Sequence, residues 1–78
     1  MTKAAFRSIL EEILSADPGS LRDTDTRAAV KNWTSLADVQ IMTVMASDLG
    51  LQEDAELLDY ETIGELLELL EQRRAFGP

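Results

Sequence analysis

The chain has 78 residues, no cysteine, no histidine and a net charge of −8 at pH 7. A chain of this length predicts one domain, 1–78, which buries only about 60% of the surface that its unfolded form exposes. Without cysteine the protein has no disulfide framework and no thiol of its own. Without histidine it lacks the usual neutral-pH general base and the commonest metal ligand.

The charge is unevenly distributed along the chain. No basic residue occurs between Lys31 and Arg73, whereas ten acidic residues do. Such a surface repels a phosphate backbone and therefore disfavours nucleic acid as a partner. Two explanations stay open: an acidic surface that keeps a small protein soluble, or a negative face that steers basic partner enzymes.

No apolar run approaches the roughly 20 residues of a transmembrane helix. The N-terminal segment also lacks a signal-peptide core, because charges recur at Arg7, Glu11 and Glu12. We therefore expect a cytoplasmic protein without a transmembrane segment. The starting Met1 favours a free-standing chain over a domain excised from a larger synthase.

The first predicted helix runs from about Lys3 to Ser15, with Thr2 as its N-cap. Its apolar residues recur at helical spacing: Phe6, Ile9, Leu10, Ile13 and Leu14. The Pro-Gly pair at 18–19 ends it. A long connection, 17–34, follows, with a short helical turn expected near 27–30. It should pack on the core through Leu21, Val30 and Trp33.

The second helix is predicted from about Ser35 to Leu49, with Gly50 as its stop. Thr34 and Ser35 both suit an N-cap, because a side-chain oxygen can accept a hydrogen bond from a free backbone N–H. Asp38 follows Ser35 by three residues, in a weaker relative of the capping box. The backbone N–H groups and the dipole at a helix start favour a nearby negative group such as a phosphate. The apolar residues are expected to form a wide stripe: 36, 39, 41, 42, 44, 45 and 49.

A short third helix is predicted around Glu53 to Leu58. The last helix opens with the capping box from Thr62 to Glu65 and carries an inward stripe of Ile63, Leu66, Leu67 and Leu70. Arg73 and Arg74 lie at its end, and 75–78 are expected to fray. No segment shows the alternation of a strand, so the fold class is all-α.

No catalytic or metal-binding constellation stands out. The acids of the last helix have the spacing of an exposed, mutually repelling face: Glu61, Glu65, Glu68 and Glu71. The acids at 54, 56 and 59 lack the spacing and the central glycine of a calcium loop. We therefore expect a protein that is not an enzyme and has no dedicated metal site.

Residues 33–42 resemble the serine signature of acyl carrier proteins and of their polyketide- and peptide-synthetase relatives. In that signature, aspartate-serine-leucine precedes a valine three residues further on. The resemblance extends to Asp25-Thr26 upstream and through Leu49-Gly50-Leu51 and Thr62-Ile63 downstream, and so covers essentially the whole chain. It implies a small four-helix bundle with a long loop between helices 1 and 2 and a short third helix.

The same resemblance implies a function as a carrier. A phosphopantetheinyl transferase would attach 4′-phosphopantetheine from coenzyme A to Ser35, and the arm would hold acyl or aminoacyl groups as thioesters. Acyl-loading and acyl-transfer enzymes would be the other partners of a monomeric carrier. Recognition by these partners is expected on the second helix, at Thr34, Leu36, Asp38, Val39, Gln40, Met42 and Asp48.

The sequence departs from the family pattern at three positions. Thr34 stands where the family has aspartate before the serine, and Ala37 and Gln40 stand where the fatty-acid type has acids. An under-charged second helix favours a specialised carrier in secondary metabolism or lipid modification. Two alternatives stay open: a carrier-fold protein that is not modified, and an unrelated acidic helical adaptor in which Ser35 only caps its helix.

Overall fold

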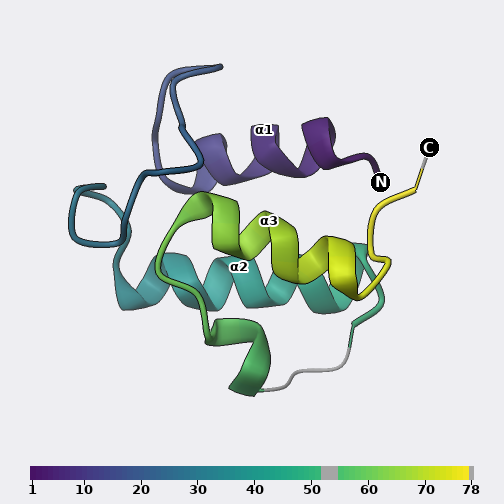
Figure 1. The fold of residues 1–78 in the computed structure, drawn as a ribbon. Helices are drawn as coiled ribbons and strands as arrows, with labels where there is room; N and C mark the ends of the chain where they lie inside the picture. The colour runs from purple at the N-terminus through teal and green to yellow at the C-terminus, as the bar shows by residue number, and fades with distance from the viewer. Residues whose placement is uncertain (52–54, 78) are drawn as a thin grey trace.

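The computed structural model describes residues 1–51 and 55–77. The elements in chain order are α1 (Lys3–Ile13), α2 (Ser35–Asp48), the 3-10 helix η1 (Ala55–Leu58) and α3 (Ile63–Gln72). In Figure 1, α1 runs along the top of the molecule, η1 lies at the bottom, and α2 and α3 cross the middle. Within the described ranges the one β pairing is an isolated bridge between Thr26 and Thr62. The all-α prediction is therefore confirmed.

The predicted four-helix bundle is not confirmed, because the described residues form three α-helices. The expected third helix, 53–58, contributes one turn of 3-10 helix at 55–58, and 53–54 lie outside the described residues. A first α-helical turn is costly to nucleate, and so short an element is typically a 3-10 turn that connects longer helices.

The helix starts agree with the capping predictions. Thr2 Oγ1 accepts a hydrogen bond from the N–H of Ala5 at 3.1 Å at the start of α1. At the start of α3, Thr62 Oγ1 accepts from the N–H of Glu65 at 3.0 Å, and the Glu65 carboxylate accepts from the N–H of Thr62 at 3.2 Å. The first helix ends at Ile13, two residues earlier than predicted, because Ser15 adopts a left-handed φ of 54°.

The core draws side chains from every element and from the segments between them. The buried apolar residues are Phe6, Leu10 and Leu14 on α1, Ala37, Ile41 and Met45 on α2, Leu57 on η1, Ile63, Leu66, Leu67 and Leu70 on α3, and Leu21, Trp33 and Tyr60 between elements. Trp33 is thus a core residue, as the sequence predicts for a lone large aromatic. No helix in the described ranges has the length and apolarity to cross a membrane.

The long connection between α1 and α2 is fixed at its beginning by two side chains of α1. Glu11 is only 6% exposed, and its carboxylate accepts hydrogen bonds from the N–H groups of Gly19 at 2.7 Å and Leu21 at 3.5 Å. Arg7 donates to the carbonyl of Leu21 and to the carboxylate of Asp23, both at 2.6 Å. That hydrogen bond from Arg7 lowers the pKa of the Asp23 carboxyl.

The middle of the same connection packs against the start of α3. The N–H groups of Ile63 and Gly64 donate to the carbonyls of Asp25 at 3.0 Å and Asp23 at 2.9 Å. The N–H of Arg27 donates in return to the carbonyl of Glu61 at 3.1 Å. The approach is so close that a Cβ at position 64 would lie 2.9 Å from the Cβ of Asp23. Glycine at position 64 therefore permits the two segments to meet.

The C-terminal segment contradicts the expectation that 75–78 fray, as far as the described residues reach. The ring centroid of Phe76 lies 5.7 Å from that of Phe6, and Phe76 packs against the core. The N–H of Ala75 donates to the carbonyl of Leu70, and that of Gly77 donates to Met1. Contact with the buried Phe6 ring anchors Phe76, although chain ends are usually mobile. The local sequence does not reveal this contact, because the two residues lie at opposite ends of the chain.

Candidate functional site

Ser35 is the first residue of α2, and its side chain is exposed. The N-cap is Thr34, whose Oγ1 accepts a hydrogen bond from the N–H of Ala37 at 3.3 Å. Within the described part of the chain, the Ser35 hydroxyl takes part in no hydrogen bond. Of the two residues that the sequence offers as N-cap, the structure therefore uses Thr34, and Ser35 does not cap the helix as one alternative supposed. Thr34 is the N-cap because its backbone is extended, with φ −100° and ψ 177°, as the N-cap position requires.

The backbone around Ser35 leaves donors available. The N–H groups of Ser35 and Leu36 lie in the first turn of α2, where no intrahelical acceptor exists. Among the residues that the structure describes, neither N–H has an acceptor. Free N–H groups and the positive end of the helix dipole both favour an anion at this point. The local chemistry therefore suits a phosphate on the Ser35 oxygen.

The apolar residues of α2 do not form the single stripe predicted from sequence. Ala37, Ile41 and Met45 face the core at intervals of four residues, whereas Leu36 is 67% exposed and Val39 is 61% exposed. The reason is the period of the helix, since positions 36 and 39 fall on the side opposite to 37, 41 and 45.

The exposed side of α2 is uncharged along most of its length. We call it the α2 outer face: Leu36, Val39, Gln40, Thr43 and Ser47, all of them exposed. Charged residues make up 28% of the whole sequence, so this face is less charged than the chain as a whole. Leu36 and Val39 are the two large apolar side chains that this face leaves exposed, and a partner could cover them.

The residues predicted to recognise partners fall into three groups. Thr34, Leu36, Val39 and Gln40 are exposed near Ser35, and Asp48 is exposed at the opposite end of the helix. Thirteen residues of α-helix place Asp48 about 20 Å from Ser35. Met42 is only partly exposed and packs against the core, and Asp38 is turned inward. Four of the seven residues are therefore exposed within five positions of the serine in the sequence.

Asp38 belongs to a cluster that the sequence does not reveal, the Arg27 cluster: Arg27, Trp33, Asp38 and Tyr60. Asp38 Oδ2 accepts a hydrogen bond from Arg27 Nη1 at 2.5 Å. Asp38 Oδ1 accepts from Trp33 Nε1 at 3.0 Å and from the Tyr60 hydroxyl at 3.4 Å. Both carboxylate oxygens are therefore engaged by side chains of the same molecule.

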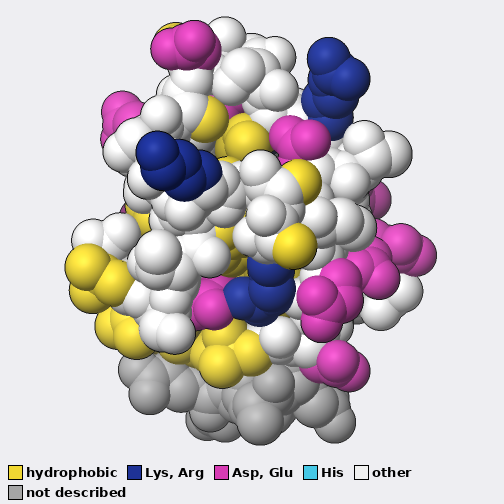
Figure 2. Space-filling view, turned by 90° about the vertical axis from the view of Figure 1, so that its left-hand side faces the viewer, with side chains coloured by type: hydrophobic (Ala, Val, Ile, Leu, Met, Phe, Trp, Pro, Cys, Tyr) yellow, Lys and Arg dark blue, Asp and Glu magenta, His cyan; other side chains and the backbone are white. Residues whose placement is uncertain are grey.

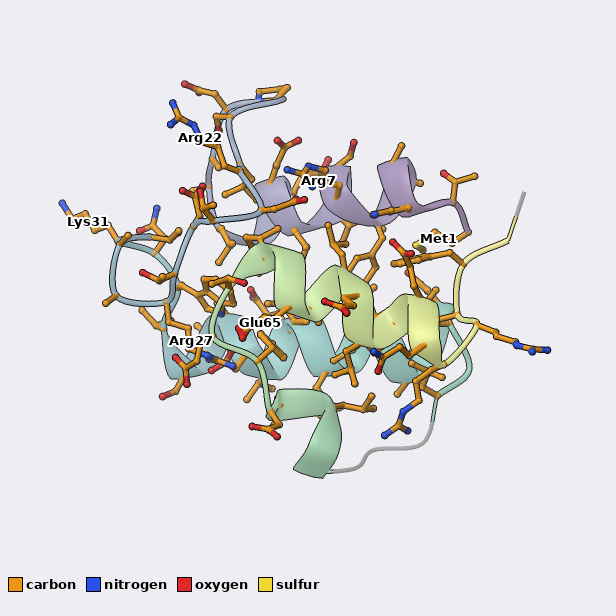
Figure 3. The ribbon with its side chains drawn as sticks, viewed as in Figure 1. Met1, Arg7, Arg22, Arg27, Lys31 and Glu65 are labelled. Carbon is orange, nitrogen blue, oxygen red and sulfur yellow. The ribbon has the colours of Figure 1, made fainter. Side chains whose placement is uncertain are left out.

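Arg27 is itself held from several directions. Its Nε donates to the carbonyl of Tyr60 at 2.9 Å, and its Nη2 donates to that of Leu58 at 3.4 Å. Its guanidinium lies 4.5 Å from the ring centroid of Tyr60 and 5.1 Å from that of Trp33, within cation–π range. In Figure 3, Arg27 turns in toward α2 below the first turn of α3, whereas Arg22 and Lys31 extend outward from the same connection.

Burial and the neighbouring Asp38 carboxylate raise the pKa of Tyr60 to about 12. Tyr60 is therefore protonated at neutral pH and acts as a hydrogen-bond donor to Asp38. The cluster joins α2 to the segment between η1 and α3, and it does so one helical turn from Ser35. Figure 2 views this end of the molecule, where basic, acidic and hydrophobic side chains reach the surface side by side.

Sequence reasoning did not identify Arg27 and Tyr60, because they lie 33 residues apart and share no local pattern. Only the part of the cluster at the helix start had a local signal. Trp33 and Asp38 lie five residues apart, and a buried indole N–H needs an acceptor such as a carboxylate.

Comparison with known proteins identifies no relative. No protein-family model matches the chain, and neither the curated proteins nor the solved structures searched contain a match.

Proposed function

We propose that the protein is a carrier that holds acyl or aminoacyl groups on a 4′-phosphopantetheine arm attached to Ser35. The observation that carries the proposal is the state of the serine itself. Thr34 supplies the N-cap, so the Ser35 hydroxyl is exposed and has no hydrogen bond within the described chain. A serine in this position is available to a modifying enzyme without loss of a structural contact.

The residues present fit the phosphate of such an arm. The N–H groups of Ser35 and Leu36 have no acceptor in the described chain, and the helix dipole favours a negative charge there. The chain contributes the nucleophile for attachment: the Ser35 oxygen would form a bond to the β-phosphorus of coenzyme A. The bond to the α-phosphate would break, adenosine 3′,5′-bisphosphate would leave, and the serine proton would pass to a base of the transferase.

When bound, the arm supplies the thiol that this cysteine-free chain lacks. The remaining work of the chain is recognition. The α2 outer face begins next to Ser35 and presents Leu36 and Val39. We propose that it receives the phosphopantetheinyl transferase and the acyl-loading and acyl-transfer enzymes. As an acyl carrier, the protein would act as a cytoplasmic monomer, with η1 in the place of the short third helix of the carrier bundle.

The decisive experiment is intact-protein mass spectrometry after incubation with coenzyme A and a broad-specificity phosphopantetheinyl transferase. We expect one phosphopantetheine on the natural sequence and none on Ser35→Ala. A carrier protein of known competence in the same tube is the positive control. If that control is modified and this chain is not, the proposal is wrong as it stands.

Thr34→Asp is the informative companion variant, because it restores the residue that the family has before its serine. Aspartate caps a helix as well as threonine does, so the substitution preserves the structural role of position 34. Any change in the rate of modification would therefore report recognition by the transferase. Rapid modification of the variant, with none of the parent, would favour the unmodified carrier fold.

A second candidate is an interaction module that needs no modification. The observation that favours it is the exposure of Leu36 and Val39 on an uncharged helix face. In that case Ser35→Ala would leave partner binding intact, whereas Leu36→Ser would weaken it.

A further inference from the structure

Arg27, from the connection before α2, forms an ion pair with Asp38 in the first turns of that helix. We infer that Arg27 is a specificity-determining residue of the α2 outer face. Because it compensates Asp38, the helix surface around Ser35 has no net charge. A partner that docks through a basic patch is then disfavoured, and a partner with an apolar hollow fits. This inference rests on the proposed function and concerns the same serine.

Asp38 is the one carboxylate that α2 holds near Ser35. The helix carries two charged residues, Asp38 and Asp48, and Asp48 lies at its opposite end. Ser35 and Asp38 are three positions apart on the helix, which places their Cβ atoms about 5–6 Å from each other. An uncompensated carboxylate at this distance would attract basic groups of a docking enzyme and speed its association.

The carboxylate is compensated on the inner side of the helix. Asp38 Oδ2 accepts a hydrogen bond from Arg27 Nη1 at 2.5 Å. Oδ1 accepts from Trp33 Nε1 at 3.0 Å and from the Tyr60 hydroxyl at 3.4 Å. The two charged side chains are each 25% exposed, so salt screens their interaction only partly. At a distance the two opposite charges cancel, and a basic group that approaches the serine meets no net charge on α2.

The surface that α2 offers beside the serine is apolar. Leu36 and Val39, three positions apart, are both exposed. The exposed acids of α3 lie on another element: Glu65, Glu68 and Glu71. In Figure 2, hydrophobic side chains gather toward the lower left of this end of the molecule and acidic ones toward the lower right. A basic patch would therefore be drawn to the acidic side, whereas an apolar hollow matches the α2 outer face.

The first test measures the initial rate of phosphopantetheine transfer from coenzyme A, by intact mass, with a transferase whose docking surface is basic. Arg27→Gln leaves the Asp38 charge uncompensated, so we expect kcat/KM to rise about three- to fivefold at low ionic strength, and less at high salt. Thr34→Asp also adds a negative charge beside the serine and should act in the same direction. Arg22→Gln is the matched control. It removes the same charge from the same connection, where the arginine side chain has no partner among the described residues, and it should change the rate by less than about twofold.

The second test addresses the apolar contact with the same transferase. Leu36→Ser and Val39→Ser should each lower kcat/KM about tenfold, by the same factor at low and high salt, because ions do not screen an apolar contact. Leu58→Ser is the control, since this exposed leucine lies on η1 and not on the α2 outer face. It should change the rate by less than about twofold. Equal losses in all three variants, or losses that vanish at high salt, would overturn the inference.

A double-variant cycle separates compensation of charge from a merely structural role. Adding Asp38→Asn to Arg27→Gln restores a neutral surface, so the rate should return to within about twofold of the parental one. A gain that persists in the double variant would overturn the inference. So would a folded Arg27→Gln protein, checked by circular dichroism, that is modified at or below the parental rate.

Two further outcomes are also decisive. If Arg27→Gln does not fold, Asp38→Asn alone decides: a rate below the parental one supports the inference, because Arg27 is then an uncompensated positive charge, and an equal or higher rate overturns it. Failure of the parent chain to be modified at Ser35 would overturn the proposed function and this inference together. Modification of the parent without a gain in Arg27→Gln would overturn this inference alone.

Discussion

The guanidinium of Arg27 lies 4.5 Å from the ring centroid of Tyr60 and donates a hydrogen bond to the backbone carbonyl of the same residue at 2.9 Å. One side chain therefore holds both the ring and the backbone of a residue that lies 33 positions further along the chain. The contact fixes the connection before α2 to the segment before α3.

The ionisation of Tyr60 should make the free energy of unfolding depend on pH in the alkaline range. Burial raises the pKa of its hydroxyl to about 12, whereas an exposed tyrosine titrates near 10. The stabilisation linked to the raised pKa is complete below pH 10 and is lost as the pH rises from 10 toward 12. We expect the free energy of unfolding, measured by urea denaturation, to fall across this range.

Tyr60→Phe provides the comparison, since Tyr60 is the single tyrosine of the sequence. The variant should be less stable than the parent at pH 8, because it lacks the hydrogen bond to Asp38, and the difference should shrink toward pH 12. A constant difference across the range would contradict the assignment.

Gly64→Ala should destabilise the protein by roughly 1–3 kcal/mol, because the added Cβ would lie 2.9 Å from the Cβ of Asp23 and 3.0 Å from its carbonyl oxygen. This cost exceeds the gain of up to about 1 kcal/mol that alanine brings to a helix. Gly77→Ala is the matched control, since a Cβ there meets nothing within 4 Å. Thermal unfolding should show a lower Tm for the first variant only, and equal Tm values would refute the close approach.

Thr34→Ala and Ser35→Ala should differ in stability although the residues are adjacent. Thr34 accepts a hydrogen bond from the N–H of Ala37, so its loss should cost about 0.5–2 kcal/mol. The Ser35 side chain is exposed and has no hydrogen bond in the described chain, so its removal should change the free energy of unfolding by no more than about 0.5 kcal/mol. Urea denaturation of both variants measures the difference, and a larger loss for Ser35→Ala would reverse the assignment of the cap.

Glu11→Ala should destabilise the protein by about 1–3 kcal/mol, because the N–H groups of Gly19 and Leu21 would lose a buried acceptor. Glu12→Ala is the control, since its side chain is exposed on the next position of the same helix. Glu11→Gln retains an acceptor and should fall between the two. The prediction fails if Glu11→Ala and Glu12→Ala have the same urea midpoint.

The sequence predicted the three α-helices because their signals are local, whereas the expected short third helix of the bundle is a 3-10 turn. Thr2 marks the start of α1, and the capping box from Thr62 to Glu65 marks the start of α3, each within a stretch of four residues. Gly50 marks the end of α2, and the structure gives it the positive φ of 68° that glycine readily adopts. The contacts that shape the site are not local. The pairing of Arg27 with residues 38 and 60, and the packing of Phe76 on Phe6, depend on how the elements meet, which no period along the chain encodes.

The proposal that Ser35 is modified comes from a resemblance to a carrier signature, whereas its role in capping the helix stayed open at the level of sequence. Thr34 and Ser35 have nearly equal capping propensity, so the sequence could not decide which of them is the N-cap. The extended backbone angles of Thr34 identify it as the cap. Asp38 was expected on a partner surface because the carrier family, which the sequence resembles, has acidic residues on its second helix. Here a buried indole and a guanidinium, both from the preceding connection, supply hydrogen bonds that turn it inward.

The hydrogen bonds between 23–27 and 61–64 have a consequence for how the molecule opens. The N–H groups of Arg27, Ile63 and Gly64 cross between two segments, so neither segment can separate without breaking the bonds of the other. Their amide hydrogens should therefore exchange with solvent through one shared fluctuation, although the residues are far apart in sequence. That fluctuation would also pull Arg27 away from the Tyr60 ring, so the start of α2 and the start of α3 should loosen as one cooperative unit.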